Sequence, residues 1–211
     1  MTVLVLARDL DPQTDRVVEA LGERGVPVFR TDLAAFPQAL TVDARFGPDG
    51  WDGVLDTGYC QVRLGEIRSV WYRHPSHFVL PDGMSGPERR HAAAEARCGL
   101  AGVLSSLDAL WVNYPARESD ALKPRQLQVA RRCGLRVPDA LVTNRPDAVR
   151  GFATAVGGAL AGKTLAAAVT PAQEWIMFEC NPFGAYGWLE EALDLPITSA
   201  LADLLAKGAT G

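Results

Sequence analysis

The first thirty residues alternate between apolar and amphipathic segments, which predicts a strand, a helix and a second strand. Residues 3–7 form a continuous apolar run with β-branched side chains, a pattern typical of a buried strand. Asp11-Pro12 then opens an amphipathic helix that closes at Gly25, and residues 26–30 form the second strand. Such a unit requires helices packed on a parallel sheet. The first turn lacks the glycines of a dinucleotide-binding loop, so we expect no site of that kind there.

From residue 40 to residue 73 the pattern changes to short apolar runs separated by Gly- and Asp-rich turns, which predicts a hairpin or meander. The four runs cover residues 40–46, 51–55, 59–64 and 69–73. Ser85 and Glu88 then have the spacing of a capping box, and a long helix is predicted to follow as far as Asp108. A strand over Trp111-Val-Asn-Tyr-Pro115 closes the first predicted domain.

Beyond residue 115 the helix and strand patterns begin again, which indicates a second domain. The predicted elements are a helix over 118–133, a strand over 140–143, a helix capped by Asn144 and ending near 156, strands over 160–165 and 174–180, and a C-terminal helix that begins at Ile197 and is closed by Lys207-Gly208. We therefore expect an α/β fold with two domains, residues 1–115 and residues 116–211.

Composition and charge exclude several classes of function. Apolar residues make up 48% of the 211 positions and charged residues 22%, as in an ordinary soluble globular protein. A net charge of −4 argues against sequence-independent binding of nucleic acid, which relies on an excess of positive charge. The opening apolar run is too short for a signal peptide or a membrane span, so we expect a cytoplasmic protein. The four cysteines lack Cys-x-x-Cys spacing, and we expect free, mostly buried thiols.

The strongest local signal for chemistry is Phe178-Glu-Cys-Asn-Pro182. Residues two apart on a strand point to the same face, so Glu179 and Asn181 would present a carboxylate and an amide oxygen side by side. Two hard oxygen ligands suit Mg²⁺, which leaves its other positions to water and phosphates. A solvated strand face, or an Asn that caps a turn before Pro, is the alternative. For Cys180 we expect a small core residue rather than a nucleophile.

Three basic residues are further candidates. Lys163 lies inside an apolar run, where it either meets an anion such as a nucleotide phosphate or protects an edge strand from aggregation. Lys123 begins a basic stretch that runs to Arg136 and suits a phosphate at a helix start, the alternative being a solvated helix face. Arg73, at a predicted strand end, would bind a substrate carboxylate or form a structural ion pair.

Several motifs, taken in order, carry a resemblance that covers essentially the whole chain. They are Val3-Leu-Val-Leu-Ala7, Val70-Trp-Tyr-Arg73, Trp111-Val-Asn-Tyr-Pro115, Lys123-Pro124, Cys133-Gly-Leu-Arg-Val-Pro138, Leu141-Val-Thr-Asn144, Lys163-Thr-Leu165 and Phe178-Glu-Cys-Asn-Pro182. Together they resemble the ATP-grasp ribosomal-peptide maturases, the microviridin-type or graspetide ligases, in their actinobacterial form. The ordered set is more specific than any single motif.

The resemblance implies a fold and a chemistry. Residues 1–115 would be a Rossmann-like pre-ATP-grasp domain, and residues 116–211 an abbreviated α+β ATP-grasp domain. Lys123 and Lys163 would hold the phosphates of ATP, and Glu179 and Asn181 would bind Mg²⁺. Members of the family activate a side-chain carboxylate of a precursor peptide as an acyl phosphate, which a Lys amine or a Ser/Thr hydroxyl then attacks to close a ring.

The chain departs from the family pattern after Leu165. A full-length ligase continues there through a phosphate-covering loop, an adenine clamp, catalytic arginines and a leader-docking element, whereas this chain continues almost directly into its last predicted hairpin. We therefore expect a missing subdomain near residues 165–169. Ala166 or Ala167 would also lie opposite Glu179, where the family has a metal-binding Asp. Weak binding of Mg²⁺–ATP and impaired or lost catalysis are the expected consequences.

Three functional hypotheses follow. The chain is an ATP-dependent carboxylate–amine or carboxylate–hydroxyl ligase, helped by a partner maturase that supplies the missing lid. Alternatively, it is a non-catalytic protein that binds a precursor peptide, a maturase or a second copy of itself. A third possibility is a gene model with an internal deletion. We expect neither a nucleic acid nor a membrane as partner, and an apolar seam left by the missing subdomain favours a homodimer.

Overall fold

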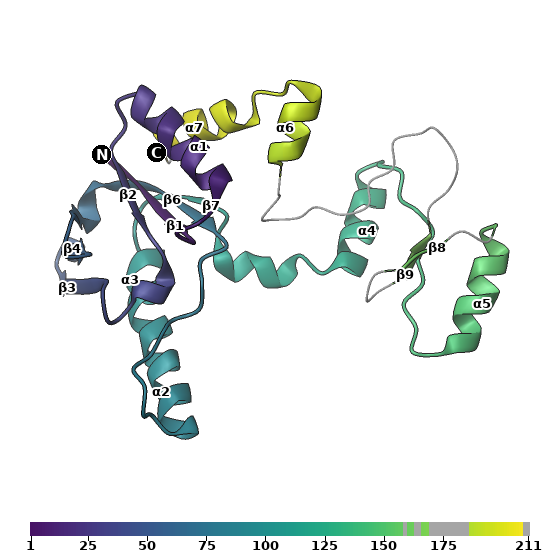
Figure 1. The fold of residues 1–211 in the computed structure, drawn as a ribbon, viewed down its shortest axis with the longest axis horizontal. Coiled ribbons are helices and arrows are strands. Elements are labelled where there is room, and N and C mark those ends of the chain that lie inside the picture. Colours follow the sequence, from purple (N-terminus) through teal and green to yellow (C-terminus); the bar gives the residue numbers. More distant parts are fainter. Residues whose placement is uncertain (158–159, 163–165, 169–185, 209–211) are drawn as a thin grey trace. The chain divides into compact units, whose positions relative to one another are not determined.

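The computed structural model describes residues 1–157, 160–162, 166–168 and 186–208 (Figure 1). The chain forms two compact units. Unit 1 comprises residues 1–116 together with 183–211, and unit 2 comprises residues 117–182. The expected second domain, residues 116–211, differs from unit 2 because the C-terminal helices belong to unit 1. None of the helices formed by the described residues combines the length and hydropathy of a membrane span.

A four-stranded parallel sheet is the centre of unit 1. Its strands are β1 (Thr2–Ala7), β2 (Val28–Thr31), β6 (Ile67–Arg73) and β7 (Leu110–Val112), in the order β2-β1-β6-β7. The predicted β-α-β unit is confirmed. The second strand begins two residues later than expected, since the amide of Val26 still donates to the carbonyl of Leu21 and closes the preceding helix.

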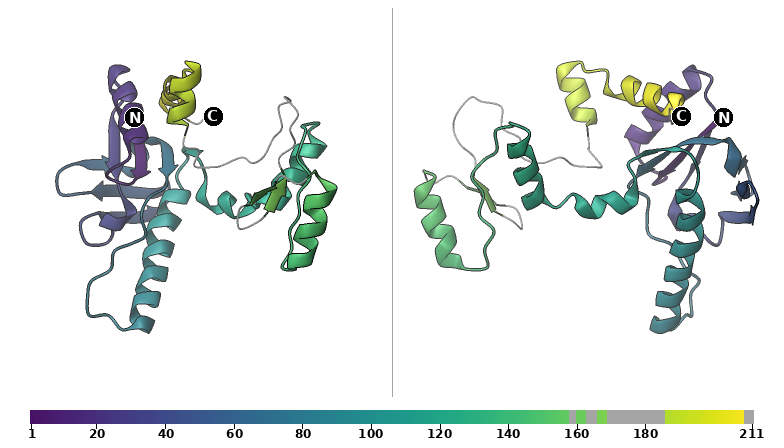
Figure 2. Two further views of the ribbon diagram at one scale, coloured as in Figure 1. Left: turned by 45° about the vertical axis from the view of Figure 1, so that its right-hand side comes forward. Right: turned by 180° about the vertical axis from the view of Figure 1, so that it is seen from behind.

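Two helices far apart in the sequence cover one face of this sheet. They are α1 (Pro12–Glu23) and α7 (Ile197–Lys207), which lie side by side in every view (Figures 1 and 2). Val3, Val5 and Ala7 point to this face, as the period of two in a strand requires. They form a buried cluster with Val17, Ala20, Leu21, Trp71, Ala202 and Leu205.

The opposite face carries a helical segment and a small antiparallel sheet. The helical segment consists of α2 (Gly86–Ala96), the π-turn η3 (Arg97–Ala101) and α3 (Gly102–Ser105). The small sheet contains β3 (Thr41–Gly47), β4 (Gly50–Asp56) and β5 (Gln61–Arg63), and short 3-10 turns η1 (Leu33–Ala35) and η2 (Leu64–Glu66) flank it. Leu4, Leu6 and Val70 form the second buried cluster with residues from these elements.

Two predictions about this face need correction. The last run of the predicted meander, residues 69–73, belongs to β6, which pairs in parallel with β1 rather than with β5. The capping box at Ser85 and Glu88 is present, but the helix it opens contains the π-turn and ends at Ser105 instead of Asp108. The sequence indicated one continuous helix because a π-turn occurs as a single turn inside an α-helix and does not end it.

Unit 2 contains α4 (Lys123–Arg132), α5 (Pro146–Ala155), β8 (Leu160–Gly162) and β9 (Ala166–Ala168). The predicted helix over 118–133 is split into the 3-10 segment η4 (Pro115–Asp120) and α4, because Pro124 fits only the first turn of a helix. The predicted strand over 140–143 is reduced to a single bridge at Ala140. Asn144 does not cap α5; the cap residue is Arg145.

β8 and β9 pair in antiparallel fashion, with Gly162 opposite Ala166 and Leu160 opposite Ala168. The rest of the strand predicted over 160–165, the strand predicted over 174–180, and the expected pairing of Ala166 or Ala167 with Glu179 lie outside the described residues.

The C-terminal region contains one element that the sequence did not predict, the helix α6 (Gly187–Leu193). It ends at Asp194, whose backbone adopts the left-handed conformation with φ of 51°. The predicted C-terminal helix is confirmed as α7. Its final carbonyls are bound by β6: Ser69 Oγ donates to the Leu205 carbonyl at 2.8 Å, and an Arg68 guanidinium nitrogen donates to the Ala206 carbonyl.

Candidate functional site at the carboxyl ends of the parallel strands

Arg73 is the last residue of β6 and lies opposite Ala7, the last residue of β1. Its side chain is almost fully buried. Nε donates to Asp11 Oδ2 at 3.2 Å, and Nη2 donates to Gln13 Oε1. A charge removed from water requires such partners, because its desolvation is otherwise costly. The sequence allowed two roles for Arg73, a structural ion pair or the binding of a substrate carboxylate. The structure shows the ion pair.

Asp11 joins this ion pair to the start of α1. Its Oδ1 accepts hydrogen bonds from the amides of Gln13 and Thr14 at 3.0 and 3.3 Å, which makes it the N-cap residue. One carboxylate therefore fixes both the helix start and the arginine. Arg30 holds the loop that precedes Asp11, since Arg30 Nη2 donates to the carbonyls of Arg8 and Asp9 at 2.9 and 2.8 Å.

His74 follows Arg73 and is exposed. Its backbone has φ of 45°, in the left-handed region that is uncommon for residues other than Gly but in which Asn, Asp and His are enriched. Partial burial, and then the positive charges of Arg73 and Arg8, hold the pKa of His74 below its ordinary value of 6.5. The charges of Arg8, which follows β1, and of Arg73, which ends β6, thus both act on His74 at the carboxyl ends of these strands.

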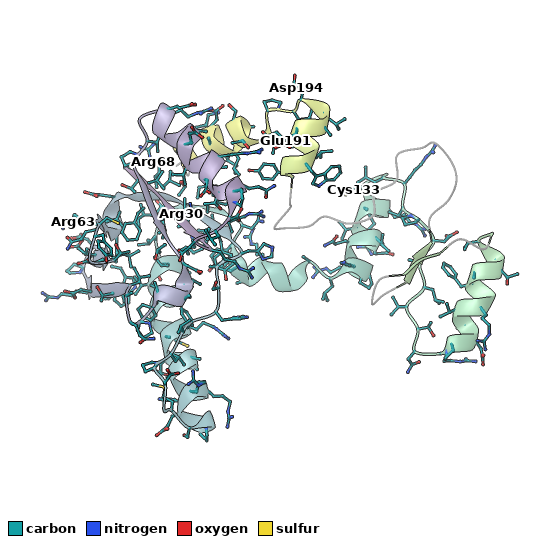
Figure 3. All side chains as sticks on the ribbon, in the orientation of Figure 1. Arg30, Arg63, Arg68, Cys133, Glu191 and Asp194 are labelled. Atoms are coloured by element: carbon teal, nitrogen blue, oxygen red, sulfur yellow. The ribbon has the colours of Figure 1, made fainter. Side chains whose placement is uncertain are left out.

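The first residues of α6 pack on the same cluster. Gly187 approaches Gln13 so closely that a Cβ atom would lie 2.8 Å from Gln13 Nε2. Burial raises the pKa of the neighbouring Tyr186, on which Arg73 and Asp11 also act electrostatically. Further along α6, Glu191 forms an ion pair with Arg16 of α1. Glu191 is labelled in Figure 3.

In unit 2, Lys123 is the first residue of α4 and is exposed. The cap residue, Leu122, contributes no side-chain hydrogen bond to the first turn, and Pro124 follows. The amide dipoles at a helix start favour an anion, so this position has the electrostatics expected for a phosphate-binding lysine.

The other predicted site residues, Lys163, Glu179 and Asn181, lie outside the described residues, as does Cys180. Within the described part of the chain no group of three His, Cys, Asp or Glu side chains could hold a metal ion. Cys60, Cys98 and Cys133 are free, as predicted, but all three are exposed, so the prediction of mostly buried thiols is wrong for them.

Sequence reasoning missed four residues of this cluster: Asp11 as the partner of Arg73, Gln13, His74 and Gly187. Asp11 was visible as a helix start, but its partner lies 62 positions away. Only the parallel pairing of β1 with β6 brings the two together, and nothing in the local pattern of either strand specifies its neighbour.

Comparison with known proteins places the chain in a family. The family model described as the MvdD pre-ATP grasp domain matches residues 2–119, more than half of the chain. The chain belongs to this family of ATP-grasp maturation proteins of ribosomally synthesised peptides. No curated protein sequence matches it.

Solved structures agree with this assignment. The macrocyclase MdnC from Microcystis aeruginosa MRC, bound with precursor peptide MdnA, is 33% identical with a TM-score of 0.65, over 76% of this chain and 53% of MdnC. A RiPP-associated ATP-grasp ligase from Chryseobacterium gregarium, in complex with ADP and a leader and core peptide, is 25% identical with a TM-score of 0.64, over 74% and 48%. This chain therefore spans about half the length of each.

A third structure, the macrocyclase MdnB from the same Microcystis strain, has a TM-score of 0.78 over 97% of this chain and 98% of MdnB, at 23% identity. At that identity the match establishes the fold alone. The predicted α/β fold with a Rossmann-like pre-ATP-grasp domain is thereby confirmed.

Proposed function

We propose that the chain acts in the maturation of a ribosomally synthesised peptide, as a member of the ATP-dependent carboxylate–amine and carboxylate–hydroxyl ligases. The observation that carries the proposal is the 33% identity with MdnC, a macrocyclase solved with its precursor peptide, over 76% of this chain. A precursor peptide is accordingly the partner we assign to it. Residues 116–211 would supply the abbreviated ATP-grasp part.

Mg²⁺–ATP is the cofactor we assign. The related ligase PsnB has been solved with Mg and ADP and with AMPPNP. Lys123 and Lys163 would neutralise phosphate oxygens, and Glu179 and Asn181 would offer oxygen ligands to the cation. Mg²⁺, when bound, would supply positive charge that stabilises the transferring phosphoryl group. The position of Lys123 at the start of α4 supports its part in this set.

We further propose that catalysis by this chain alone is impaired. Only three positions separate β8 from β9, and Ala166–Ala168 bring no carboxylate to the hairpin. The alternative is a non-catalytic protein that binds a precursor peptide, a partner maturase or a second copy of itself.

Calorimetric titration with Mg²⁺–ATP tests the nucleotide assignment. Because Ala166–Ala168 bring no carboxylate to the hairpin, we expect weak binding of Mg²⁺–ATP that does not saturate at sub-millimolar concentration. Lys207→Ala is the matched control for Lys163→Ala, because Lys207 is the third lysine of the chain and lies on α7 in unit 1. Tight binding that Lys163→Ala abolishes and Lys207→Ala leaves intact would instead establish an active nucleotide site.

Co-expression with a precursor peptide tests the reaction. A self-sufficient ligase removes one water per ring, which mass spectrometry detects, and we expect no such loss from this chain without a partner maturase. Loss of water with the purified chain, ATP and Mg²⁺ would overturn the proposal of impaired catalysis. A monomeric sedimentation profile at micromolar concentration would remove the homodimer.

A further inference from the structure

The two C-terminal helices are held on unit 1 in different ways. In α7, Ala202 and Leu205 are 0% exposed and belong to the buried cluster that includes α1. The side chains of Ser69 and Arg68 also donate hydrogen bonds to the last carbonyls of α7. In α6, by contrast, no residue is buried. Helix α6 therefore lacks the burial of apolar surface that stabilises the position of α7.

Helix α6 contacts α1 through polar groups, and its large apolar side chains are exposed to solvent. Glu191 forms the ion pair with Arg16 (Glu191 is labelled in Figure 3). Trp188 is 69% exposed and Leu193 is 56% exposed. A helix that is fixed by packing on a core normally buries its apolar stripe. The contact between α6 and α1 thus depends on groups that water can solvate equally well.

The polar contacts of α6 are weak ones. The Arg16 and Glu191 side chains are 47% and 63% exposed. Ion pairs at such positions contribute little to stability and are screened by salt. The second contact joins Glu190 to the hydroxyl and amide of Thr198, at the start of α7, and both residues are only partly buried. Neither contact resembles the buried attachment of α7.

The three residues between α6 and α7 are Asp194, Leu195 and Pro196, and all are exposed. Asp194, which is labelled in Figure 3, has φ of 51°, in the left-handed region where Asp is enriched. Hinges are a few residues at the ends of elements that absorb a change of φ and ψ. A change at these positions would leave the buried cluster of α7 undisturbed.

The start of α6 covers a functionally important edge of the sheet. Gly187 lies against Gln13, and Tyr186 is close enough to Arg73 and Asp11 to respond to their charges. These three residues of α1 and β6 are called the Arg73 cluster below. The connection that follows β1 lies on one face of the sheet and the connection that follows β6 on the other. In open α/β sheets, ligands bind outside the carboxyl ends of the strands at such a point.

We propose that α6 is a strap over the carboxyl ends of β1 and β6, which opens about residues 194–196 while α7 stays on unit 1. In the closed position the start of α6 covers the Arg73 cluster. Opening breaks the contacts of Glu191 and Glu190 and exposes the cluster to solvent. The strap controls access to this edge of the sheet. It concerns unit 1 alone and does not depend on the proposed function.

Double electron–electron resonance between spin labels on the full chain measures the opening. The four native cysteines are replaced by Ser, and labels are attached at Glu19→Cys of α1 and Leu193→Cys of α6. A second pair, Glu19→Cys with Leu204→Cys of α7, is the matched control. All three labelled positions are exposed, so the fold should persist. We expect two separations for the α1–α6 pair and one for the α1–α7 pair.

Salt and a charge variant should shift the balance between the two positions. Raising NaCl from about 0.1 M to about 1 M should increase the open fraction roughly threefold, because salt screens an exposed ion pair. Glu191→Gln should give a similar increase at low salt and remove the further effect of salt. Asp203→Asn is the matched variant, since it removes the carboxylate that Arg24 binds on α7. It should leave the α1–α6 separations unchanged.

Two results would overturn the opening. One is a single α1–α6 separation that neither salt nor Glu191→Gln alters. The other is a parallel change in the α1–α7 pair, because the whole C-terminal region would then leave unit 1. An effect of Asp203→Asn as large as that of Glu191→Gln would contradict the role of the Glu191 ion pair, because opening would then follow overall charge.

Chemical modification tests whether the strap covers the Arg73 cluster. Phenylglyoxal reacts with exposed guanidinium groups, and peptide mass spectrometry follows its reaction at Arg73. We expect modification to be roughly threefold faster in Glu191→Gln than in the parent protein, in proportion to the open fraction, and unchanged in Asp203→Asn. Equal rates at Arg73 in Glu191→Gln and the parent protein would show that α6 does not control access. No nucleotide is present, so failure of Mg²⁺–ATP binding would leave this test unaffected.

Discussion

The two compact units differ in burial and in charge. Unit 1 holds two clusters of buried apolar side chains, one on each face of its parallel sheet. Among the residues of unit 2 whose burial is described, Ala130 and Pro138 are buried, and α5 has no buried residue. Unit 1 has 12 basic and 19 acidic residues, and unit 2 has 9 basic and 6 acidic, so their net charges are −7 and +3.

The difference in burial and charge indicates that the two units contribute differently to stability and to the proposed binding of phosphate. Burial of apolar surface is the main favourable contribution to folding, so unit 1 carries the described core on its own. The excess of positive charge in unit 2 agrees with the phosphate-binding role proposed for Lys123 and Lys163. A weakly buried part gains most from a ligand that binds only its folded form. If the proposed roles of Lys123 and Lys163 hold, unit 2 should therefore gain more stability from Mg²⁺–ATP than unit 1 does.

Hydrogen exchange should show the largest contrast. Amides of β1 and β6 should exchange only by global unfolding, whereas those of α4 and α5 should exchange by local opening. We expect exchange in α4 and α5 to be about a thousandfold faster, which corresponds to ~4 kcal/mol. Native-state exchange followed by mass spectrometry measures both regions in one sample. Equal protection of α5 and β1 would abolish the distinction between the units.

The second prediction concerns the membership of α7 in unit 1. Leu205 is 0% exposed and packs in the cluster with α1, whereas Leu204, on the same helix, is 45% exposed. Leu205→Ala should therefore lower the free energy of unfolding by about 3 kcal/mol. Leu204→Ala is the matched control and should cost less than ~1 kcal/mol. Urea denaturation measures both, and similar losses would show that α7 is not part of the core.

The third prediction concerns the cluster around Arg73. Asp11→Ala removes the cap of α1 and leaves the buried Arg73 without its carboxylate, which should cost about 2 kcal/mol. Asp15→Ala removes an exposed partner of Arg30 in the same helix and should cost less than ~0.5 kcal/mol. Thermal unfolding of both variants compares them. If Asp15→Ala proved the more destabilising, Arg73 would not depend on Asp11.

Local pattern predicted most elements of unit 1 because each strand of its parallel sheet is followed by a clear helix or turn signal. Val3–Ala7, Asp11-Pro12 and the Ser85 capping box all depend on residues close in sequence. The partners of β6 and the place of α7 depend on contacts 60 to 138 residues apart, which one sequence does not encode locally.

In unit 2 the local pattern was less informative. The segment around Lys123 looked like one helix because the basic stretch is amphipathic, yet Pro124 sets the helix start. Asn144 precedes α5 by two positions and was assigned a cap that the structure gives to Arg145. Few of the described residues of this unit are buried, so the hydrophobic periodicity indicates its helices and strands only weakly. The remaining local signals for helix starts and caps were of similar strength.

The smallest expected effect concerns the junction of α6 and α7, where the contribution to stability should depend on pH. Glu190 accepts hydrogen bonds from the Thr198 hydroxyl and amide, each at 2.6 Å, and the hydroxyl is the larger cause of a lowered pKa for Glu190. A carboxyl whose pKa is lowered in the folded state contributes stability above its ordinary pKa of 4.5, and that stability is lost as the pH falls through the lowered value.

Thr198→Val removes the hydroxyl and keeps the amide. The variant should lose less than about 1 kcal/mol at pH 7, because both residues are only partly buried, and the difference from the parent protein should shrink as the pH falls below 4.5. Thr41→Val is the matched control, since the Thr41 hydroxyl donates to a backbone carbonyl in unit 1 and not to a carboxylate. Urea denaturation at both pH values gives the two differences. A loss in Thr198→Val that is as large in acid as at neutral pH would mean that the hydroxyl stabilises the junction without the charge of Glu190.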